Sequence, residues 1–250
     1  MTEPFIPQIS MASTADDAID LLVQVGWRAV GTGDWATALA NPGDTHCARV
    51  VPFDPAYRIY ADDVLAGPPN RWLPRIDQIL PLRGSGYVVI MQRLWAADET
   101  AANHFCAALG VANTSGYAQP PLGKFDSVDD VDLAALRVRV QAMIALGAAR
   151  YRLWGGSDIR AGNVMADALG RLKLVDPVFL AGLKIVQAIG DGDAAALVDF
   201  TRAQLEDFLT IAAFLRTNDN ADTTGGLRAA LDRLDLTQGR PGSPAKAEPM

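Results

Sequence analysis

Four polar residues between positions 154 and 178 are of the types that transfer a phosphoryl group. Asp158 is followed five residues later by Asn163, and Asp176 follows thirteen residues after that. A carboxylate can orient a hydroxyl group, an amide and a second carboxylate can hold Mg²⁺, and Arg160 can neutralise a phosphate. We therefore predict a catalytic pair and a metal-binding pair: Asp158 with Arg160, and Asn163 with Asp176. The alternative is a polar loop before an ordinary surface hairpin, since Asp and Asn are common in turns.

The flanking sequence predicts a β-hairpin that brings these side chains together. A turn is expected at 168–170, and the alternation of Leu172 and Leu174 predicts the strand that ends at Asp176. A long helix is expected directly before the loop, because Ser127 and Asp130 resemble a capping box. The apolar face of that helix has these members: Leu133, Leu136, Val140, Met143 and Ile144.

The N-terminal part is predicted to contain strands around two glycines. Strands are expected at 27–30, 35–40, 45–51, 80–83 and 87–91, and further helices at 14–24, 54–66, 96–109, 193–216 and 226–234. The first of these helices would be capped by Ser13 or Thr14, and the second by Asp54. Gly31 and Gly33 lie in the first turn, where glycines let a backbone flap approach phosphate groups. The pair is weak evidence by itself, because such glycines also turn ordinary hairpins.

The composition indicates a compact protein and argues against several kinds of partner. Of the 250 residues, 50% are apolar and 20% are charged, which suits one large or two small lobes with a real core. The net charge is −7 without a cluster of Lys or Arg, so neither nucleic acid nor a membrane is expected as a partner. Two cysteines and two histidines make a zinc site implausible. No signal peptide or membrane-spanning apolar run is visible, which predicts a cytoplasmic protein.

The spacing of the polar residues resembles that of the protein-kinase-like superfamily. In that superfamily an aspartate, an asparagine and a magnesium-binding aspartate follow one another as Asp158, Asn163 and Asp176 do here. Ser157 precedes Asp158 where protein kinases have arginine and aminoglycoside phosphotransferases have glycine. Pro177 follows Asp176 where protein kinases have phenylalanine and glycine. In this respect the chain is similar to compact kinase-like proteins of bacteriophages and some bacteria.

The resemblance implies that the N-terminal part binds ATP. Gly31 and Gly33 match the glycine-rich loop over the phosphates, with Ala36 in the position of the third glycine. Arg49 stands where the family has the lysine that contacts the phosphates. This departure matters because a guanidinium is longer than an ammonium group and is forked.

The helix after this strand should carry the partner of that cation. Kinases use a glutamate there, whereas this helix offers only Asp62 and Asp63, which either pair with Arg49 or are ordinary solvated residues. The resemblance also implies that Met91 lines the back of the adenine pocket. The backbone of Gln92–Leu94 would then contact the base as the hinge between the lobes.

The implied fold class is α+β, a bilobal protein-kinase-like fold over about 27–190 with a shortened, mainly helical C-terminal lobe. We expect residues 1–250 to form a single kinase-like domain. Its parts would be an N-terminal lobe with a small antiparallel sheet and the hinge (27–94), a C-terminal lobe (95–236) and a disordered tail (237–250).

The resulting functional hypothesis is transfer of the γ-phosphoryl group of ATP, with Mg²⁺, to a protein serine or threonine. Asp158 would be the catalytic base. Two alternatives stay open: a pseudokinase or nucleotide-binding module without transfer, and a small-molecule kinase of the aminoglycoside phosphotransferase type. If the protein is encoded by a phage, its expected location is the cytoplasm of the host.

Overall fold

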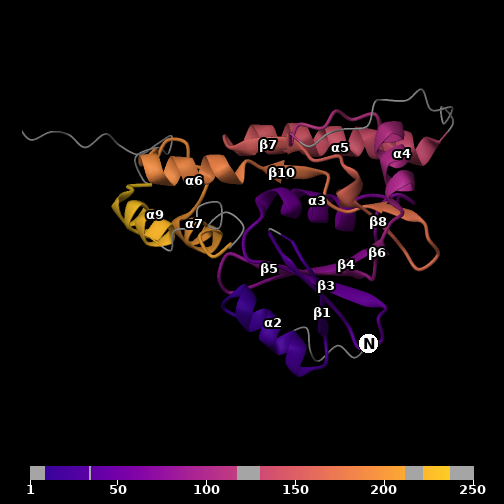
Figure 1. Ribbon diagram of the computed structural model, residues 1–250, viewed down its shortest axis with the longest axis horizontal. Coiled ribbons are helices and arrows are strands. Elements are labelled where there is room, and N and C mark those ends of the chain that lie inside the picture. Colours follow the sequence, from indigo (N-terminus) through magenta and orange to yellow (C-terminus); the bar gives the residue numbers. More distant parts are fainter. Residues whose placement is uncertain (1–8, 34, 117–129, 212–221, 237–250) are drawn as a thin grey trace, which may run out of the picture.

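The computed structural model describes residues 9–33, 35–116, 130–211 and 222–236. These residues form a sheet lobe (9–92) and a mainly helical lobe (95–236), as Figure 1 shows. A cleft lies between the two lobes. The architecture is therefore α+β, with the antiparallel sheet first and most of the helices after it, as the sequence predicts. The described part of the chain contains no helix that is long and apolar enough to cross a membrane.

The sheet lobe is organised around five antiparallel strands in the order β1-β2-β3-β5-β4. They are β1 (Arg28–Thr32), β2 (Thr37–Ala40), β3 (His46–Val51), β4 (Ile76–Pro81) and β5 (Tyr87–Gln92). The pairing of β3 with β5 has no register shift from His46↔Gln92 to Val51↔Tyr87. Because β3 lies in the middle of the sheet, the side chains that it carries have a fixed direction.

Two helices pack against the sheet. α2 (Ala15–Gln24) begins with the predicted cap, since Thr14 and Asp17 form a capping box, and Leu22 packs with Leu39 in a separate small core. α3 (Pro55–Ala66) begins at the predicted Asp54 cap and packs in the large core shared with the helical lobe. Figure 1 shows α2 on the side of the sheet away from the helical lobe and α3 between the sheet and that lobe.

The helical lobe has long helices and two small ladders of strands. The helices are α4 (Glu99–Leu109), α5 (Val131–Arg150), α6 (Gly182–Asp191), α7 (Arg202–Phe208) and α9 (Asp222–Arg233). One ladder joins β6 (Trp95–Ala96), β8 (Val164–Ala166) and β9 (Leu172–Leu174), and the other joins β7 (Trp154–Ser157) to β10 (Val178–Leu180). The predicted hairpin is therefore present as β8 and β9.

Several predicted boundaries are wrong. The strand expected at 80–83 is β4, which begins earlier at Ile76. Of the helix expected at 193–216, the described residues contain only α7. Thr201 caps the start of α7, and the residues before it form turns. The long helix α5 is capped by Asp130, and Ser127 lies outside the described residues, as does the segment 237–250.

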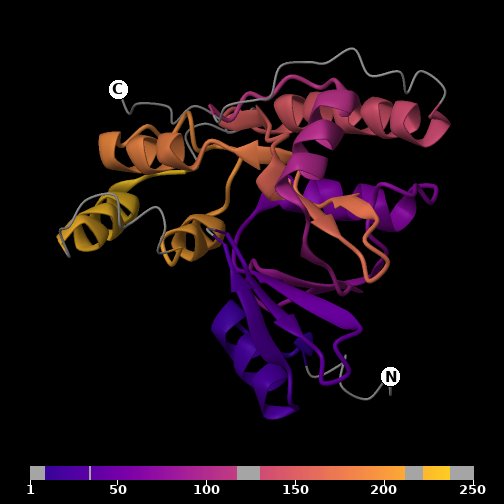
Figure 2. The same cartoon turned by 45° about the vertical axis from the view of Figure 1, so that its right-hand side comes forward.

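α7 joins the two lobes on one side of the cleft. The ring of Phe208 lies 5.8 Å from Trp35 and 5.7 Å from Phe53, both of which belong to the sheet lobe. The Ser85 hydroxyl also donates a hydrogen bond to the Asp207 carboxylate of α7. Figure 2 shows α7 beside the strands of the sheet lobe. The cleft is thus bordered by an aromatic contact as well as by the hinge.

Candidate active site

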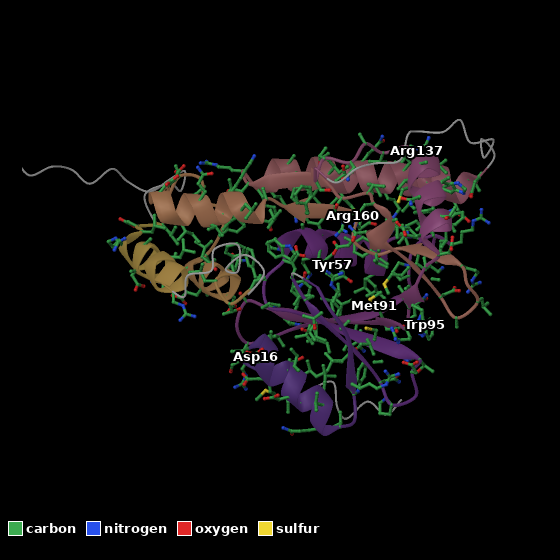
Figure 3. All side chains as sticks on the ribbon, in the orientation of Figure 1. Asp16, Tyr57, Met91, Trp95, Arg137 and Arg160 are labelled. Atoms are coloured by element: carbon green, nitrogen blue, oxygen red, sulfur yellow. The ribbon has the colours of Figure 1, made fainter. Side chains whose placement is uncertain are left out.

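A cavity of about 770 Å³ lies between the lobes and contains most of the predicted site residues. From the predicted set it is lined by Gly31, Gly33, Arg49, Met91, Gln92, Leu94, Asp158, Arg160, Asn163 and Asp176. The volume is in the range of clefts that bind small ligands and cofactors. In Figure 3, the labelled Tyr57 and Met91 come from α3 and β5, and Arg160 comes from the helical lobe.

Backbone pairing places Asp158 beside Asp176. β7 ends at Ser157 and pairs antiparallel with β10, so that Val178 lies opposite Ser157. Directly after this pair, the Asp158 amide donates to the carbonyl of Pro177 at 2.8 Å. The residues that follow one strand and precede the other are therefore neighbours in space.

Asn163 joins the two aspartates through its side-chain amide. Its Nδ2 donates to the Asp158 carbonyl, to Asp158 Oδ2 and to the Asp176 carbonyl, each at 2.8 Å. The Val175 amide donates back to the Asn163 carbonyl at 3.0 Å, which ties the loop to the end of β9. With its nitrogen turned into the protein, Asn163 has its side-chain oxygen available as a ligand.

Each aspartate also has an arginine partner. Arg160 Nε lies 3.1 and 3.2 Å from the two oxygens of Asp158, and Arg49 Nη2 lies 2.7 Å from Asp176 Oδ2. Burial raises the pKa of Asp176, and the charge of Arg49 opposes this rise. For Arg49, burial works against the charged form, but Asp176, Tyr57 and Asp54 together outweigh burial and raise the pKa above its usual value. The two lobes are thus linked by an ion pair within the cleft.

The predicted partners of Arg49 on α3 are wrong. Asp62 faces outward and pairs with Arg58 at 2.9 Å, one helical turn away. Asp63 is taken by Arg139 of α5 at 2.6 Å. Neither aspartate lines the cavity, because the end of α3 that carries them packs against α5 and solvent rather than against β3.

Among the cavity-lining residues that the sequence analysis did not identify, Asp54 and Tyr57 lie closest to the predicted charges. Asp54, the cap of α3, lines the cavity, and burial together with the nearby charge of Asp176 raises its pKa to about 7. Tyr57 lies in the first turn of α3 and places its ring 3.6 Å from the guanidinium carbon of Arg49. The capping pattern predicted Asp54 as a helix start, but no spacing rule indicated that this start faces the cleft.

The apolar end of the cavity lies next to the hinge. Met91, Gln92 and Leu94 line it as expected, and the Gln92 side chain is held by the Arg75 amide at 3.0 Å. Further apolar lining comes from Ala38, Cys47, Met165 and Val175. Gly31 and Gly33 border the cavity from β1 and its turn, and neither would bring a Cβ closer than 3.9 Å to another atom. This end can accept a flat apolar ring.

The oxygen atoms at the other end suit Mg²⁺. The Asn163 side-chain oxygen and the Asp176 carboxylate are hard ligands that line the same cavity. Among the described residues there is no cluster of three or more His, Cys, Asp or Glu that could enclose a metal ion. A site with two protein ligands fits an ion that also takes oxygens from phosphate groups and water.

The order of elements agrees with the resemblance described above: an antiparallel sheet with a helix comes first, and a mainly helical part follows. Neither a protein-family model nor a curated protein sequence matches the chain. Among solved structures, aminoglycoside phosphotransferase APH(3'')-Id from Streptomyces rimosus is similar at 11% identity, covering 88% of this chain and 98% of that one, with a TM-score of 0.31. Aminoglycoside phosphotransferase APH(4)-Ia is similar at 13% identity, covering 86% and 97%, with a TM-score of 0.31. At this level of similarity, the function has to be inferred from the side chains of this chain.

Proposed function

We propose that this protein is an ATP-dependent phosphotransferase that transfers the γ-phosphoryl group to a hydroxyl group. The observation that carries this proposal is the convergence of Asp158, Asn163 and Asp176, tied together by three hydrogen bonds from one amide group. Carboxylates held side by side in a cleft, with arginines near them, provide the positioning and charge stabilisation on which phosphoryl transfer depends.

The cavity gives the nucleotide one orientation. The adenine ring would lie among apolar residues such as Met91 and Leu94, next to the hinge. The triphosphate would then extend below the Gly31–Gly33 turn towards Arg49. Arg49 would leave Asp176 and bind phosphate oxygens, for which a forked guanidinium has suitable geometry.

The metal-binding residues would be Asn163 and Asp176. Mg²⁺ bound there would bridge phosphate oxygens and reduce the charge repulsion between the triphosphate and Asp176. Because the same three hydrogen bonds occupy the Asn163 nitrogen, the side-chain oxygen would be the atom that binds the metal ion. Removing this amide would therefore disturb both the metal ligand and the position of Asp158.

Asp158 would orient the acceptor hydroxyl and accept its proton. Its side chain is largely buried, with 13% of its surface exposed, and is held by Asn163 and Arg160. Arg160 is more exposed, at 36%, and would turn from Asp158 to the transferred phosphoryl group. Its charge would be most useful in the transition state, when negative charge spreads over the phosphoryl oxygens.

For the acceptor we propose a serine or threonine side chain of a protein. Besides Asp158, the lining of the cavity includes Ser115, Phe179, Leu183 and Lys184. Leu183 is 62% exposed, which offers an apolar contact for a peptide at the surface. The same continuous cavity also suits a small-molecule hydroxyl. The described lining has three aspartates balanced by Arg49, Arg160 and Lys184. Because it offers no excess of negative charge, a polycationic small molecule is the less suitable acceptor.

The alternative is a nucleotide-binding module without transfer activity. One observation favours it: Asp158 and Asp176 are both engaged by arginines, so neither is free for an acceptor or a metal ion in this arrangement. An enzyme must exchange both ion pairs when Mg²⁺-ATP binds, whereas a binding module needs to exchange only the pair at Asp176.

The test is transfer of label from γ-³²P-ATP, with Mg²⁺, to three classes of acceptor. These are the protein itself, a mixture of serine- and threonine-containing peptides, and small molecules, with the polycation hygromycin B among them. We expect incorporation into peptide or protein that is lost in Asp158→Asn, a variant of the same size that cannot accept the proton. Metal-dependent ATP binding without transfer to any acceptor would support the binding module. Transfer unaffected by Asp158→Asn would place the chemistry elsewhere.

A further inference from the structure

The cationic residue of β3 has an unusual neighbour on α3. Both carboxylates in the second half of α3 are engaged elsewhere, Asp62 by Arg58 and Asp63 by Arg139. The residue of α3 that meets Arg49 is Tyr57, and the guanidinium carbon lies 3.6 Å from the centre of its ring. This short distance places the guanidinium directly over the ring face.

The ring of Tyr57 is held from several directions. The Tyr57 amide donates to Asp54 Oδ1 at 2.9 Å, which fixes the first turn of α3. Its hydroxyl lies 3.8 Å from the sulfur of Met91 on β5, and its ring lies 5.4 Å from that of Tyr60. Tyr57 is fully buried, and burial raises the pKa of its hydroxyl to about 12, so the ring stays neutral. It is a rigid, uncharged platform.

A neutral platform differs from a carboxylate partner in its effect on charge. A carboxylate would compensate part of the positive charge of Arg49, whereas an aromatic face orients the guanidinium and leaves most of its charge available. When Asp176 exchanges Arg49 for a metal ion, the ring would still hold the guanidinium in the cleft. An ammonium group has no plane to stack, so this arrangement also gives a reason for arginine in place of lysine.

We propose that Tyr57 is the positioning residue for Arg49: its ring holds the guanidinium where the phosphate chain of a nucleotide passes, and it thereby sets the affinity for phosphates. The inference rests on the proposed function, because it concerns the same nucleotide site. Tyr57 acts through Arg49 and does not itself contact the reacting atoms. Its effect should therefore grow with the number of phosphates that the ligand carries.

The experiment measures the affinities of ATP and AMP, with Mg²⁺, by titration calorimetry. Tyr57→Met fills a similar space without an aromatic face. We expect this variant to lower the affinity for ATP by about tenfold or more and to change the affinity for AMP by less than about threefold. The ratio of the ATP affinity to the AMP affinity should therefore fall. Tyr57→Phe keeps the ring and should keep the ratio.

Two controls separate positioning from structural damage. Phe105→Leu removes a buried ring of α4 that lies 5.1 Å from the ring of Trp72 and is not part of the cavity lining; it should leave the ratio unchanged. In an Arg49→Ala background, Tyr57→Met should have no further effect on the ratio, because the group it positions is gone. If Tyr57→Met does not fold, Tyr57→Trp keeps a broad aromatic face and should retain the ratio, whereas Arg49→Lys should lower it.

The outcomes can be told apart from failure of the proposed function. An unchanged ratio in Tyr57→Met, an equal fall in Phe105→Leu, or an equal fall in the Arg49→Ala background would each overturn the inference. With Tyr57→Met unfolded, an unchanged ratio in Arg49→Lys would overturn it. If the parent protein binds ATP but transfers no phosphate, the proposed enzyme activity is wrong. The role of Tyr57 is then still decided by the ratio of the ATP and AMP affinities. A parent protein that binds no nucleotide would overturn both.

Discussion

The two walls of the cleft are held in place in different ways. The wall of the helical lobe is built from neighbours in sequence, since Asn163 bonds Asp158 and Asp176 directly through backbone and side-chain oxygens. The wall of the sheet lobe depends on contacts between distant elements, because Arg49 of β3 is held by Tyr57 of α3 and by Asp176 of the other lobe. The first wall is fixed by local geometry, and the second can be rebuilt with different side chains.

The largest effect is expected at Asp158, in the wall that belongs to the helical lobe. Asp158→Asn keeps the size of the side chain but removes the proton acceptor, so transfer should fall by about 10²–10⁴-fold. ATP affinity should stay nearly constant, because Asp158 does not hold the metal ion. Label transfer and calorimetry on the same samples provide the test. A parallel loss of affinity would show that Asp158 belongs to the nucleotide site.

A smaller effect, on both quantities, is expected from the amide that ties this wall together. Asn163→Ala removes a metal ligand and three hydrogen bonds, so Mg²⁺-ATP affinity and transfer should each fall by roughly 10–100-fold. Asn163→Asp restores a metal ligand but loses the donors, and its metal affinity should exceed that of Asn163→Ala. Metal titrations monitored by ATP binding would show this order. Equal affinity in the parent and Asn163→Ala would exclude Asn163 as a ligand.

The local wall also requires a glycine before the catalytic loop. Gly156 has φ +104°, and a Cβ there would lie 2.3 Å from Thr114 Oγ1, which accepts a bond from the Ser157 amide. We expect Gly156→Ala to lower the free energy of unfolding by roughly 1–3 kcal/mol or more, measured in urea. Gly170 has φ +74° and no atom near its Cβ position, so Gly170→Ala carries only the backbone cost. Its free energy of unfolding should fall by less than that of Gly156→Ala. Equal losses would mean that the contact with Thr114 is unimportant.

The smallest effect is a pH dependence that originates in the sheet lobe. The pKa of Asp54 is raised to about 7, so between about pH 4 and 7 the folded chain keeps a proton that the unfolded chain has released. The free energy of unfolding should therefore fall as pH rises through this window and level off above it. Asp54→Asn keeps a helix cap without a titrating group, so the free energy of unfolding of this variant should fall less over the same pH range. Identical pH profiles from urea unfolding at pH 5, 6, 7 and 8 would contradict this assignment.

The difference between the walls explains what could be predicted from the sequence. The positions of Asp158, Asn163 and Asp176 were predictable, because a hairpin fixes their distances once its turn is recognised. The caps at Thr14 and Asp54 were predictable for the same reason, since they depend on residues a few positions away.

The partner of Arg49 was not predictable from spacing. Which face of α3 meets β3 is decided by packing against α5, where Arg139 binds Asp63 and turns that end of the helix away from the cleft. Only the fold brings Tyr57 under the guanidinium. The late start of α7 at Arg202 was missed for a related reason, because the apolar residues at 193–200 continue a helical period although their backbone forms turns.

The most direct test of the cleft as a metal-dependent nucleotide site is ATP binding by the parent and by Asp176→Asn, with and without Mg²⁺. Calorimetry gives the affinity, and the shift in melting temperature on the same samples checks it. We expect Mg²⁺ to strengthen ATP binding in the parent and to have little effect in Asp176→Asn, which retains the size of the side chain but not its charge. Equal strengthening by Mg²⁺ in both proteins would contradict the assignment of Asp176 as the metal ligand.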